Sequence, residues 1–334
     1  MKTIRRALCA LALGPAFAVY ADFSWELSGA LGQADRSEED EVFRTLGEFE
    51  SDLVALSAAY HFDPVEDGNG PYALAGFFDP ATRVSVAASE DQQTNRLTTP
   101  GVFAEAERAI ADYSVAGQYL FSESRWYAGG RYGRGDFSQP ELTQQPPPPP
   151  GPRPTQSFDL ERYGLLAGKY FGTGATRLEL SLDRSKATSE TSLTSCAPTC
   201  VTIGTNVESI SDTASFEVMH VRRFRSATYA LLGGISELQA EVTANSTFGP
   251  VIAPDPEPVD SYFVGAELYP VPAVGVRLGY VHTDLPLSEN ENVGVGASWF
   301  FRRNVGFDLA LTREDSDVQP RTERVMLRVI GRLR

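Results

Sequence analysis

Residues 291–314 read ENVGVGASWFFRRNVGFDLALTRE, and the alternation in this stretch decides the fold. Apolar side chains occupy the odd positions from 293 to 301 and again from 305 to 311, while most even positions carry small or polar residues such as Asp308. Two arginines separate the two runs. A period of two residues is typical of a strand with one apolar and one polar face. The stretch therefore predicts two β-strands joined by a tight turn.

The same rhythm recurs from residue 23 to the last residue, in segments of about ten residues that end in turns or polar loops. It predicts fourteen strands, near 23–33, 51–62, 81–90, 109–122, 124–135, 158–171, 175–186, 212–224, 226–237, 259–270, 273–284, 291–301, 304–314 and 323–334. A soluble sandwich strand also alternates, so the alternation by itself does not indicate a membrane protein.

The connections between the predicted strands alternate between long and short. The long ones are 34–50, 91–108, 136–157, 187–211 and 238–258, and the one exception to the alternation is 63–80. Outer-membrane barrels have this asymmetry, with short periplasmic turns, long extracellular loops and an even number of strands. We therefore predict an all-β fold, a transmembrane antiparallel up-and-down β-barrel of about 14 strands, within a range of 12 to 16.

Aromatic residues gather at the ends of the strands that lead into short turns. Such residues favour the headgroup layer of a membrane, so we expect them to form an interfacial girdle. They are Tyr60, Phe62, Phe121, Trp126, Tyr170, Phe171, Phe224, Tyr229, Tyr269, Trp299 and Phe301.

The N-terminus has the pattern of a secretory signal peptide. Lys2, Arg5 and Arg6 precede an apolar run that ends near Phe17, which is too short to span a bilayer. Small residues up to Ala21 offer cleavage sites. We expect residues 1–21 to be a cleaved signal peptide and residues 22–334 to form a single barrel domain.

Composition excludes other classes of protein. The chain of 334 residues has 44 acidic and 29 basic residues and a formal charge of −15, which repels nucleic acid. After the N-terminus no stretch approaches the ~20 apolar residues of a spanning helix. No phosphate-binding or dinucleotide motif is present, so we expect no cofactor.

The polar positions of the predicted strands should face the lumen of the barrel. Fourteen strands lie between the eight that side chains fill and the sixteen to eighteen that leave a wide channel, so a modest water-filled lumen is expected. The candidates for lumen-facing charges are Arg324, Arg328, Arg332, Glu179, Asp183, Glu217, Arg277 and Asp308. Glu26, Asp52, Asp112, Glu267, Arg125, Arg131 and Arg177 are also predicted to face inward.

Two interpretations of these charges remain open. The arginines of the last strand lie across a fourteen-stranded ring from Glu179, Asp183 and Glu217. Opposed basic and acidic walls would create a transverse field in the channel, because low-dielectric walls focus the potential. Alternatively, each charge pairs with a neighbour on the wall and serves only to hold the barrel in shape.

Three features of the predicted long loops suggest local structure. Cys196 and Cys200 are close in sequence, and secretion favours a disulfide between them; a metal site would need further ligands nearby, so none is expected. The run from Pro146 to Pro154 favours polyproline II, either as an external arm or folded into the lumen. The acidic cluster at 35–41 favours a hydrated loop over a cation site.

Nothing in the chain indicates an enzyme. The chain has three histidines, and the only dyad worth naming is His282 with Asp284, which lie two residues apart on a predicted strand and so share one face. Paired polar residues at a barrel rim are common, so we assign no catalytic residues.

Two segments resemble a known family. DFSWELSGALGQ, residues 22–33, and PYALAGFFDPATRVSVAAS, residues 71–89, resemble the start of the mature chain and of the third strand in the general porin family of Gram-negative outer-membrane β-barrels. The chain departs from the usual outer-membrane pattern at its C-terminus, which is Leu333-Arg334 and not an aromatic residue.

This resemblance implies an outer-membrane porin, a channel for passive diffusion of small hydrophilic solutes or ions. The alternative is a closed structural or adhesive barrel whose long loops bind surface partners. The expected partners are outer-membrane lipid and lipopolysaccharide, the barrel-assembly machinery and small polar solutes, with no nucleic acid. Both monomers and oligomers fit the sequence.

Overall fold

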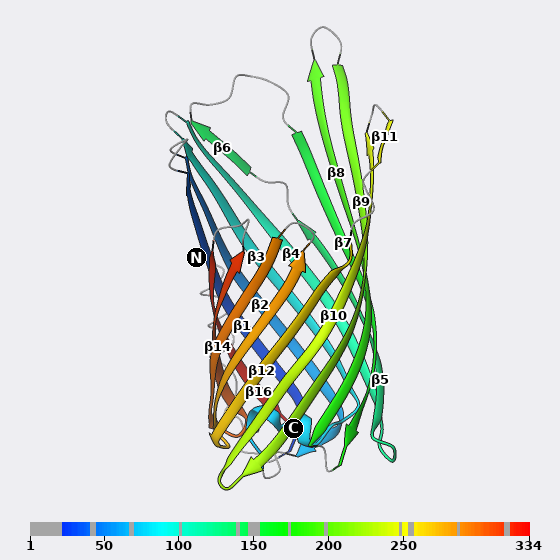
Figure 1. The fold of residues 1–334 in the computed structure, drawn as a ribbon, viewed down its shortest axis with the longest axis vertical. Coiled ribbons are helices and arrows are strands. Elements are labelled where there is room, and N and C mark those ends of the chain that lie inside the picture. The colour runs from blue at the N-terminus through cyan, green and yellow to red at the C-terminus, as the bar shows by residue number, and fades with distance from the viewer. Residues whose placement is uncertain are drawn as a thin grey trace.

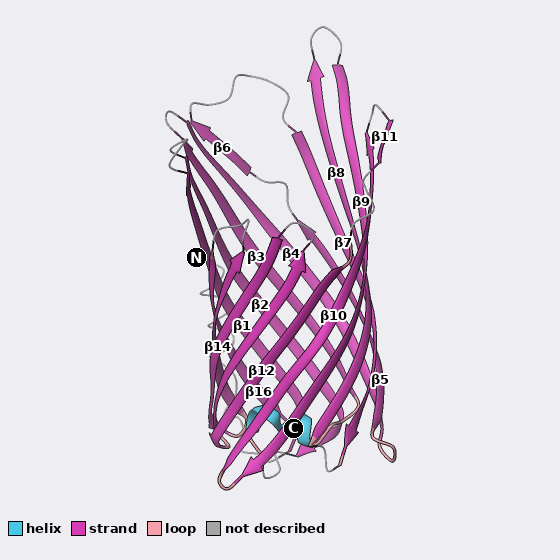
Figure 2. Ribbon diagram, viewed as in Figure 1, coloured by secondary structure: helices cyan, strands magenta, loops and turns pink. Residues whose placement is uncertain are grey.

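The computed structural model is a closed antiparallel β-barrel (Figures 1 and 2). It describes residues 22–40, 45–66, 70–99, 102–137, 141–145, 154–172, 175–196, 200–246, 249–252, 257–285, 288–316 and 321–334. Each barrel strand pairs with its sequence neighbours, and the last strand pairs with the first, from Trp25 opposite Leu333 to Arg36 opposite Thr322. The prediction of a fourteen-stranded barrel is confirmed.

The fourteen barrel strands coincide one for one with the predicted segments. They are β1 (Asp22–Asp40), β2 (Thr45–Glu66), β3 (Arg83–Thr99), β4 (Val102–Phe121), β5 (Trp126–Phe137), β7 (Pro154–Phe171), β8 (Thr176–Cys196), β9 (Cys200–Phe224), β10 (Ala227–Ser246), β12 (Val259–Val271), β13 (Val274–Leu285), β14 (Ser288–Arg302), β15 (Val305–Ser316) and β16 (Thr322–Leu333). Two short strands, β6 (Glu141–Gln145) and β11 (Gly249–Ile252), pair with β4 and β10 outside the ring.

Several strands are much longer than the sequence predicted. Residues expected to lie in loops, such as 91–99, 102–108, 187–196 and 200–211, continue the sheet, so that β9 has 25 residues. A membrane-spanning strand needs only about 9–11 residues. The excess therefore extends beyond an apolar band, and β8 and β9 rise above the other strands at the long-loop end of the barrel (Figure 1).

The outer surface of the barrel carries an apolar band. Large hydrophobic side chains remain exposed there, including Leu165 at 68% and Leu182 at 62%. The band ends where outward positions become charged, as at Arg184, which follows Leu182 on the same face of β8 and pairs with Asp212. Such a band is what a bilayer requires of the outer face of a β-barrel. Neither of the two described helices is long and apolar enough to cross a membrane.

The exceptional connection at 63–80 forms neither a strand nor an open loop. After β2 the chain makes a 3-10 turn, η1 (Tyr72–Leu74), and one turn of helix, α2 (Ala75–Phe78), before β3 begins. We call residues 70–82 the plug segment. Prolines lie on both sides of its helical turns. A residue that precedes a proline is restricted from helical backbone dihedral angles, and for this reason α2 ends before Asp79-Pro80.

Tyr170, Tyr269 and Asp52 face the opposite side from the one predicted, and a shift in register turns Phe23 inward as well. The register shifts between Phe23 and Trp25, so Phe23 turns inward to contact His61 while Trp25 stays exposed. Tyr170 and Tyr269 were expected in the outer girdle but are buried, at 6% and 5% exposure, in a cluster inside the barrel. Asp52 is the register partner of Gln33, and Gln33 is the register partner of Val325. Register partners in neighbouring strands face the same side, and Val325 is exposed on the outer face, so Asp52 also lies on the outer face.

Candidate constriction inside the barrel

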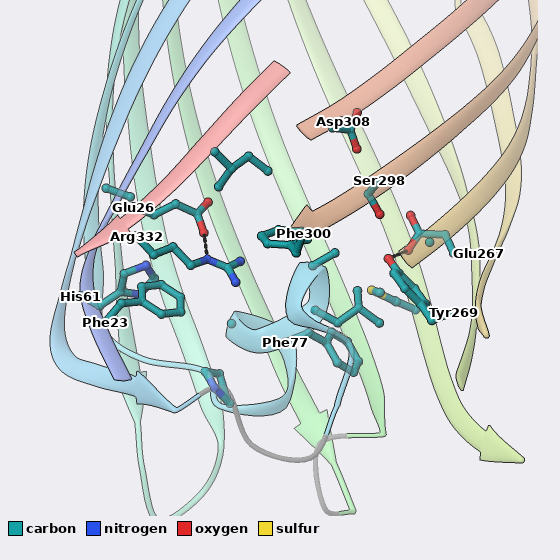
Figure 3. A pocket seen from close by; sticks show the side chains of 18 of the residues that line it. Phe23, Glu26, His61, Phe77, Glu267, Tyr269, Ser298, Phe300, Asp308 and Arg332 are labelled. Carbon is teal, nitrogen blue, oxygen red and sulfur yellow. Dashed lines mark hydrogen bonds and ion pairs between the residues drawn. The ribbon is translucent and has the colours of Figure 1, made fainter. Parts of the chain in front are cut away.

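The plug segment lies inside the short-turn end of the barrel (Figures 1 and 3). Phe77 packs edge-on against Tyr170 of β7, with ring centroids 5.9 Å apart. On the other side, the backbone N–H of Tyr72 donates to the carbonyl of Pro272, 2.9 Å away, in the turn after β12. The segment thus contacts well-separated parts of the wall, and it narrows the lumen at this end.

An apolar core fixes the position of the plug segment. Leu74 and Phe77 are each 7% exposed and belong to a cluster with inward-facing residues of β5, β7, β9, β10 and β12. These wall residues are Tyr127, Tyr170, Met219, Val221, Ala230 and Tyr269. Burial of apolar area stabilises such a contact by about 25 cal/mol per Å², so the plug segment is part of the folded barrel rather than a loose tether.

Arg332 of β16 connects the plug segment to the wall. It donates from Nε to Glu26 Oε2 at 2.9 Å and from Nη1 to the carbonyl oxygen of Tyr72 at 2.7 Å. Its guanidinium lies between the rings of Phe23 and Phe300, at 4.6 Å and 5.0 Å from their centroids. Arg332 is only 5% exposed. A cation held by a carboxylate, a carbonyl and two aromatic faces is well compensated for its burial.

The lumen wall above the plug segment is lined by charges that pair across neighbouring or next-but-one strands. Arg277 binds Asp308 through two hydrogen bonds of 2.6 Å and 2.5 Å, and this carboxylate is nearly buried. The other cross-strand pairs are Arg177 with Glu217, Arg131 with Asp183, and Arg162 with Asp112. Tyrosine hydroxyls donate to two further carboxylates, from Tyr127 to Glu179 and from Tyr269 to Glu267, each at 2.6 Å.

The structure places the eight predicted lumen residues as follows. Glu179, Asp183 and Glu217 each have a local partner, as do Arg277, Asp308 and Arg332. Arg328 and Arg324 share the inward face of β16 with Arg332, and within the described chain neither guanidinium has a hydrogen bond or ion pair. Of the acidic residues opposite β16, Asp183 and Glu217 are neutralised by arginines, and Glu179 accepts a hydrogen bond from Tyr127, which favours local pairing over a strong transverse field.

A cavity of about 330 Å³ lies between the plug segment and the wall (Figure 3). The plug segment contributes apolar residues including Leu74 and Phe77. The wall contributes five arginines and three carboxylates: Arg83, Arg177, Arg277, Arg328, Arg332, Glu26, Glu267 and Asp308. Basic residues therefore outnumber acidic ones around this cavity, although the whole chain is strongly acidic.

Several residues of this constriction were not predicted, although strand parity indicates that they face the lumen. Tyr170 and Phe171 are adjacent in one strand, so only one of them can face lipid. The same holds for Trp126 and Tyr127. Arg83 precedes Val84 and Val86, which are exposed on the outer face, and must therefore face inward. Nothing in the sequence indicated that residues 70–82 would fold into the lumen.

The remaining sequence predictions concern other parts of the molecule. His282 Nε2 lies 2.8 Å from Asp284 Oδ1, with its ring stacked on Tyr262, on the outer face of the long-loop half. Within the described chain no group of three or more His, Cys, Asp or Glu side chains has a metal-binding arrangement. The backbones of Cys196 and Cys200 are register partners at the tip of the β8–β9 hairpin. Their side chains, the residues predicted to form a signal peptide (1–21) and the run from Pro146 to the residue before β7 lie outside the described part.

Comparison with known proteins identifies the fold but not a family. No family model and no curated relative matches the chain. The outer membrane protein Omp33 of Acinetobacter baumannii superposes with a TM-score of 0.53 and 12% identity, over 94% of this chain and 99% of that one. This likeness shows an outer-membrane barrel fold.

Two further solved structures are similar at lower scores. The translocator domain of the autotransporter NalP from Neisseria meningitidis has a TM-score of 0.46 and 12% identity, over 99% of this chain and 95% of that one. The CymD monoaromatic hydrocarbon channel has a TM-score of 0.45 and 11% identity, over 93% of this chain and 89% of that one.

Proposed function

We propose that this protein is an outer-membrane porin of a Gram-negative bacterium, which passes small hydrophilic solutes or ions down their gradients. One observation carries the proposal: an apolar outer band encloses a lumen lined with paired charges, and about 330 Å³ of that lumen stays open beside the plug segment. A barrel with only a structural role has no need of a charged, incompletely filled interior.

The resemblance of residues 22–33 and 71–89 to general porins supports the same function. The second of these segments includes all of the plug segment except Gly70, so the resemblance extends to the part of the chain that narrows the lumen. A channel narrowed to this degree would admit small solutes and exclude large ones, since the constriction sets the size limit.

Liposome swelling tests this function directly. We expect proteoliposomes to swell in solutions of small sugars and amino acids, and the rate to fall steeply as solute mass rises. Protein-free liposomes and liposomes with a heat-denatured sample serve as controls. Swelling at the background rate for the smallest solute would reject the channel and favour the closed adhesive barrel.

A further inference from the structure

We infer that the cavity between the plug segment and the wall is a binding site for small organic carboxylates, to which Arg83 and Arg328 supply the attracting positive charge. The inference deepens the proposed channel function, because the site lies in the lumen through which solutes would pass. It rests on the excess of arginines over carboxylates around the cavity and on the apolar residues that form its floor.

The cavity has a surplus of positive charge. Of its five arginines, Arg277 is paired with Asp308, Arg332 with Glu26, and Arg177 with Glu217 just outside the cavity. The guanidiniums of Arg83 and Arg328 have no hydrogen bond or ion pair with any described residue. The one remaining carboxylate, Glu267, accepts from Tyr269 at 2.6 Å and keeps its negative charge, so the two unpaired arginines exceed it by one positive charge.

Unpaired guanidiniums in a partly enclosed lumen favour an anion. Their donors are fixed in a planar fork that matches the two oxygens of a carboxylate, and both side chains are exposed to the lumen, so an anion that enters can reach them. Elsewhere on the inner wall, Arg131 and Arg162 have carboxylate partners within the protein. Arg83 and Arg328 therefore present open binding capacity to whatever enters the cavity.

The floor of the cavity is apolar, which distinguishes an organic anion from phosphate or chloride. Leu74 and Phe77 from the plug segment and Phe300 and Ile330 from the wall line it, and each is less than a tenth exposed. A volume of about 330 Å³ is at the lower end of ligand pockets, which range over roughly 300–1,000 Å³. A carboxylate with a compact apolar body, of the size of benzoate, fits both features.

Isothermal titration of the purified, detergent-solubilised barrel with benzoate tests the inference. We expect saturable binding that benzamide, the neutral isostere, does not reproduce. Arg83→Gln and Arg328→Gln should each weaken benzoate binding about tenfold, as expected for loss of one charge-assisted hydrogen bond. Arg324→Gln is the matched control, because Arg324 lies on the same face of β16 but outside the cavity lining, and it should bind benzoate as the wild type does.

Three outcomes would overturn the inference. They are equal binding of benzoate and benzamide, an equal loss in Arg324→Gln, and binding of inorganic phosphate or chloride as tight as that of benzoate. The result is separable from the channel function, since titration requires no transport. Benzoate binding with background liposome swelling would reject the channel and keep the site, whereas swelling without benzoate binding would do the reverse.

Discussion

At the scale of single residues, Arg332 has the largest number of distinct roles. It closes the barrel beside Glu26, holds the carbonyl of Tyr72 in the plug segment and fills the space between two aromatic rings. Strand parity predicted that Arg332 faces inward. Its contact with Tyr72 could not be predicted, because it depends on the path of residues that lie about 260 positions earlier in the chain.

Arg332→Met should destabilise the barrel. The change keeps much of the side-chain volume but leaves Glu26 unpaired and the Tyr72 carbonyl without its donor. Loss of one partner of a fully buried ion pair lowers the free energy of unfolding by about 3–5 kcal/mol. Because Glu26 is 33% exposed, we expect a smaller decrease here, of about 2 kcal/mol. Urea unfolding in lipid vesicles, followed by tryptophan fluorescence, measures it. Arg328→Met, at an unpaired position of the same strand face, should change stability by less than about 0.5 kcal/mol.

A glycine in β7 leaves room for a buried tyrosine. An added Cβ at Gly168 would collide with the Tyr127 ring and with the carbonyl of Leu178. Tyr127 is 1% exposed and donates to Glu179, so it has no free space to move into. Gly168→Ala should therefore destabilise by about 1–3 kcal/mol, the usual cost of overpacking.

Gly117 provides the control for this substitution, because an added Cβ there meets nothing within 4 Å. Gly117→Ala should be neutral or slightly stabilising, since alanine restricts the unfolded chain. The midpoints of urea unfolding compare the two variants. Similar midpoints for both would show that Tyr127 does not need the space that Gly168 leaves.

At the scale of elements, the sequence located all fourteen strands but not their ends. Alternation marks a strand where one face meets lipid and the other the lumen, as in β15, whose predicted and observed ranges nearly agree. Above the membrane both faces are polar, so the alternation disappears although the backbone pairing continues. For that reason residues 200–211 of β9 were predicted to be loop.

The plug segment was unpredictable for a different reason. Its sequence has proline at both ends and an apolar centre, which predicts a turn but not its location. Leu74 and Phe77 are buried only because Tyr170, Met219 and Tyr269 from distant strands converge on them. Such convergence is a property of the closed ring and is absent from any local pattern.

The tip of the β8–β9 hairpin supplies a test at the same scale. Cys196 and Cys200 oppose each other in an antiparallel pair, whose Cα separation of about 4.5–5.5 Å suits a disulfide. We expect mass spectrometry of the non-reduced protein to show this bond. Reduction should leave the unfolding midpoint nearly unchanged, because so small a loop adds little entropy to the unfolded state. Free thiols in the protein secreted into an oxidising compartment would contradict the prediction.

At the scale of the whole molecule, the barrel separates its charges by location. The paired lumen charges largely cancel, while Arg83 and Arg328 leave the cavity beside the plug segment positive. The narrowest part of a channel determines which ions pass. Ion selectivity should therefore follow these two arginines rather than the net charge of −15.

Reversal potentials in a KCl gradient measure this selectivity. We expect a preference for chloride in the wild type, and its loss in the double variant Arg83→Gln/Arg328→Gln. The variant Arg324→Gln should keep most of the preference. If the wild type is cation-selective and the double variant has the same reversal potential, the two arginines do not determine the selectivity. The acidic loops would then be its source.

The central claim is that the barrel is a channel narrowed by the plug segment. Single-channel conductance in planar bilayers tests it most directly, with the wild type compared with a variant in which residues 68–80 are replaced by Gly-Ser-Gly. Retention of the folded barrel is checked first by heat-modifiable migration on a denaturing gel. We predict small, discrete current steps for the wild type and steps several-fold larger for the shortened variant. No steps from either protein, or steps of equal size from both, would contradict the account.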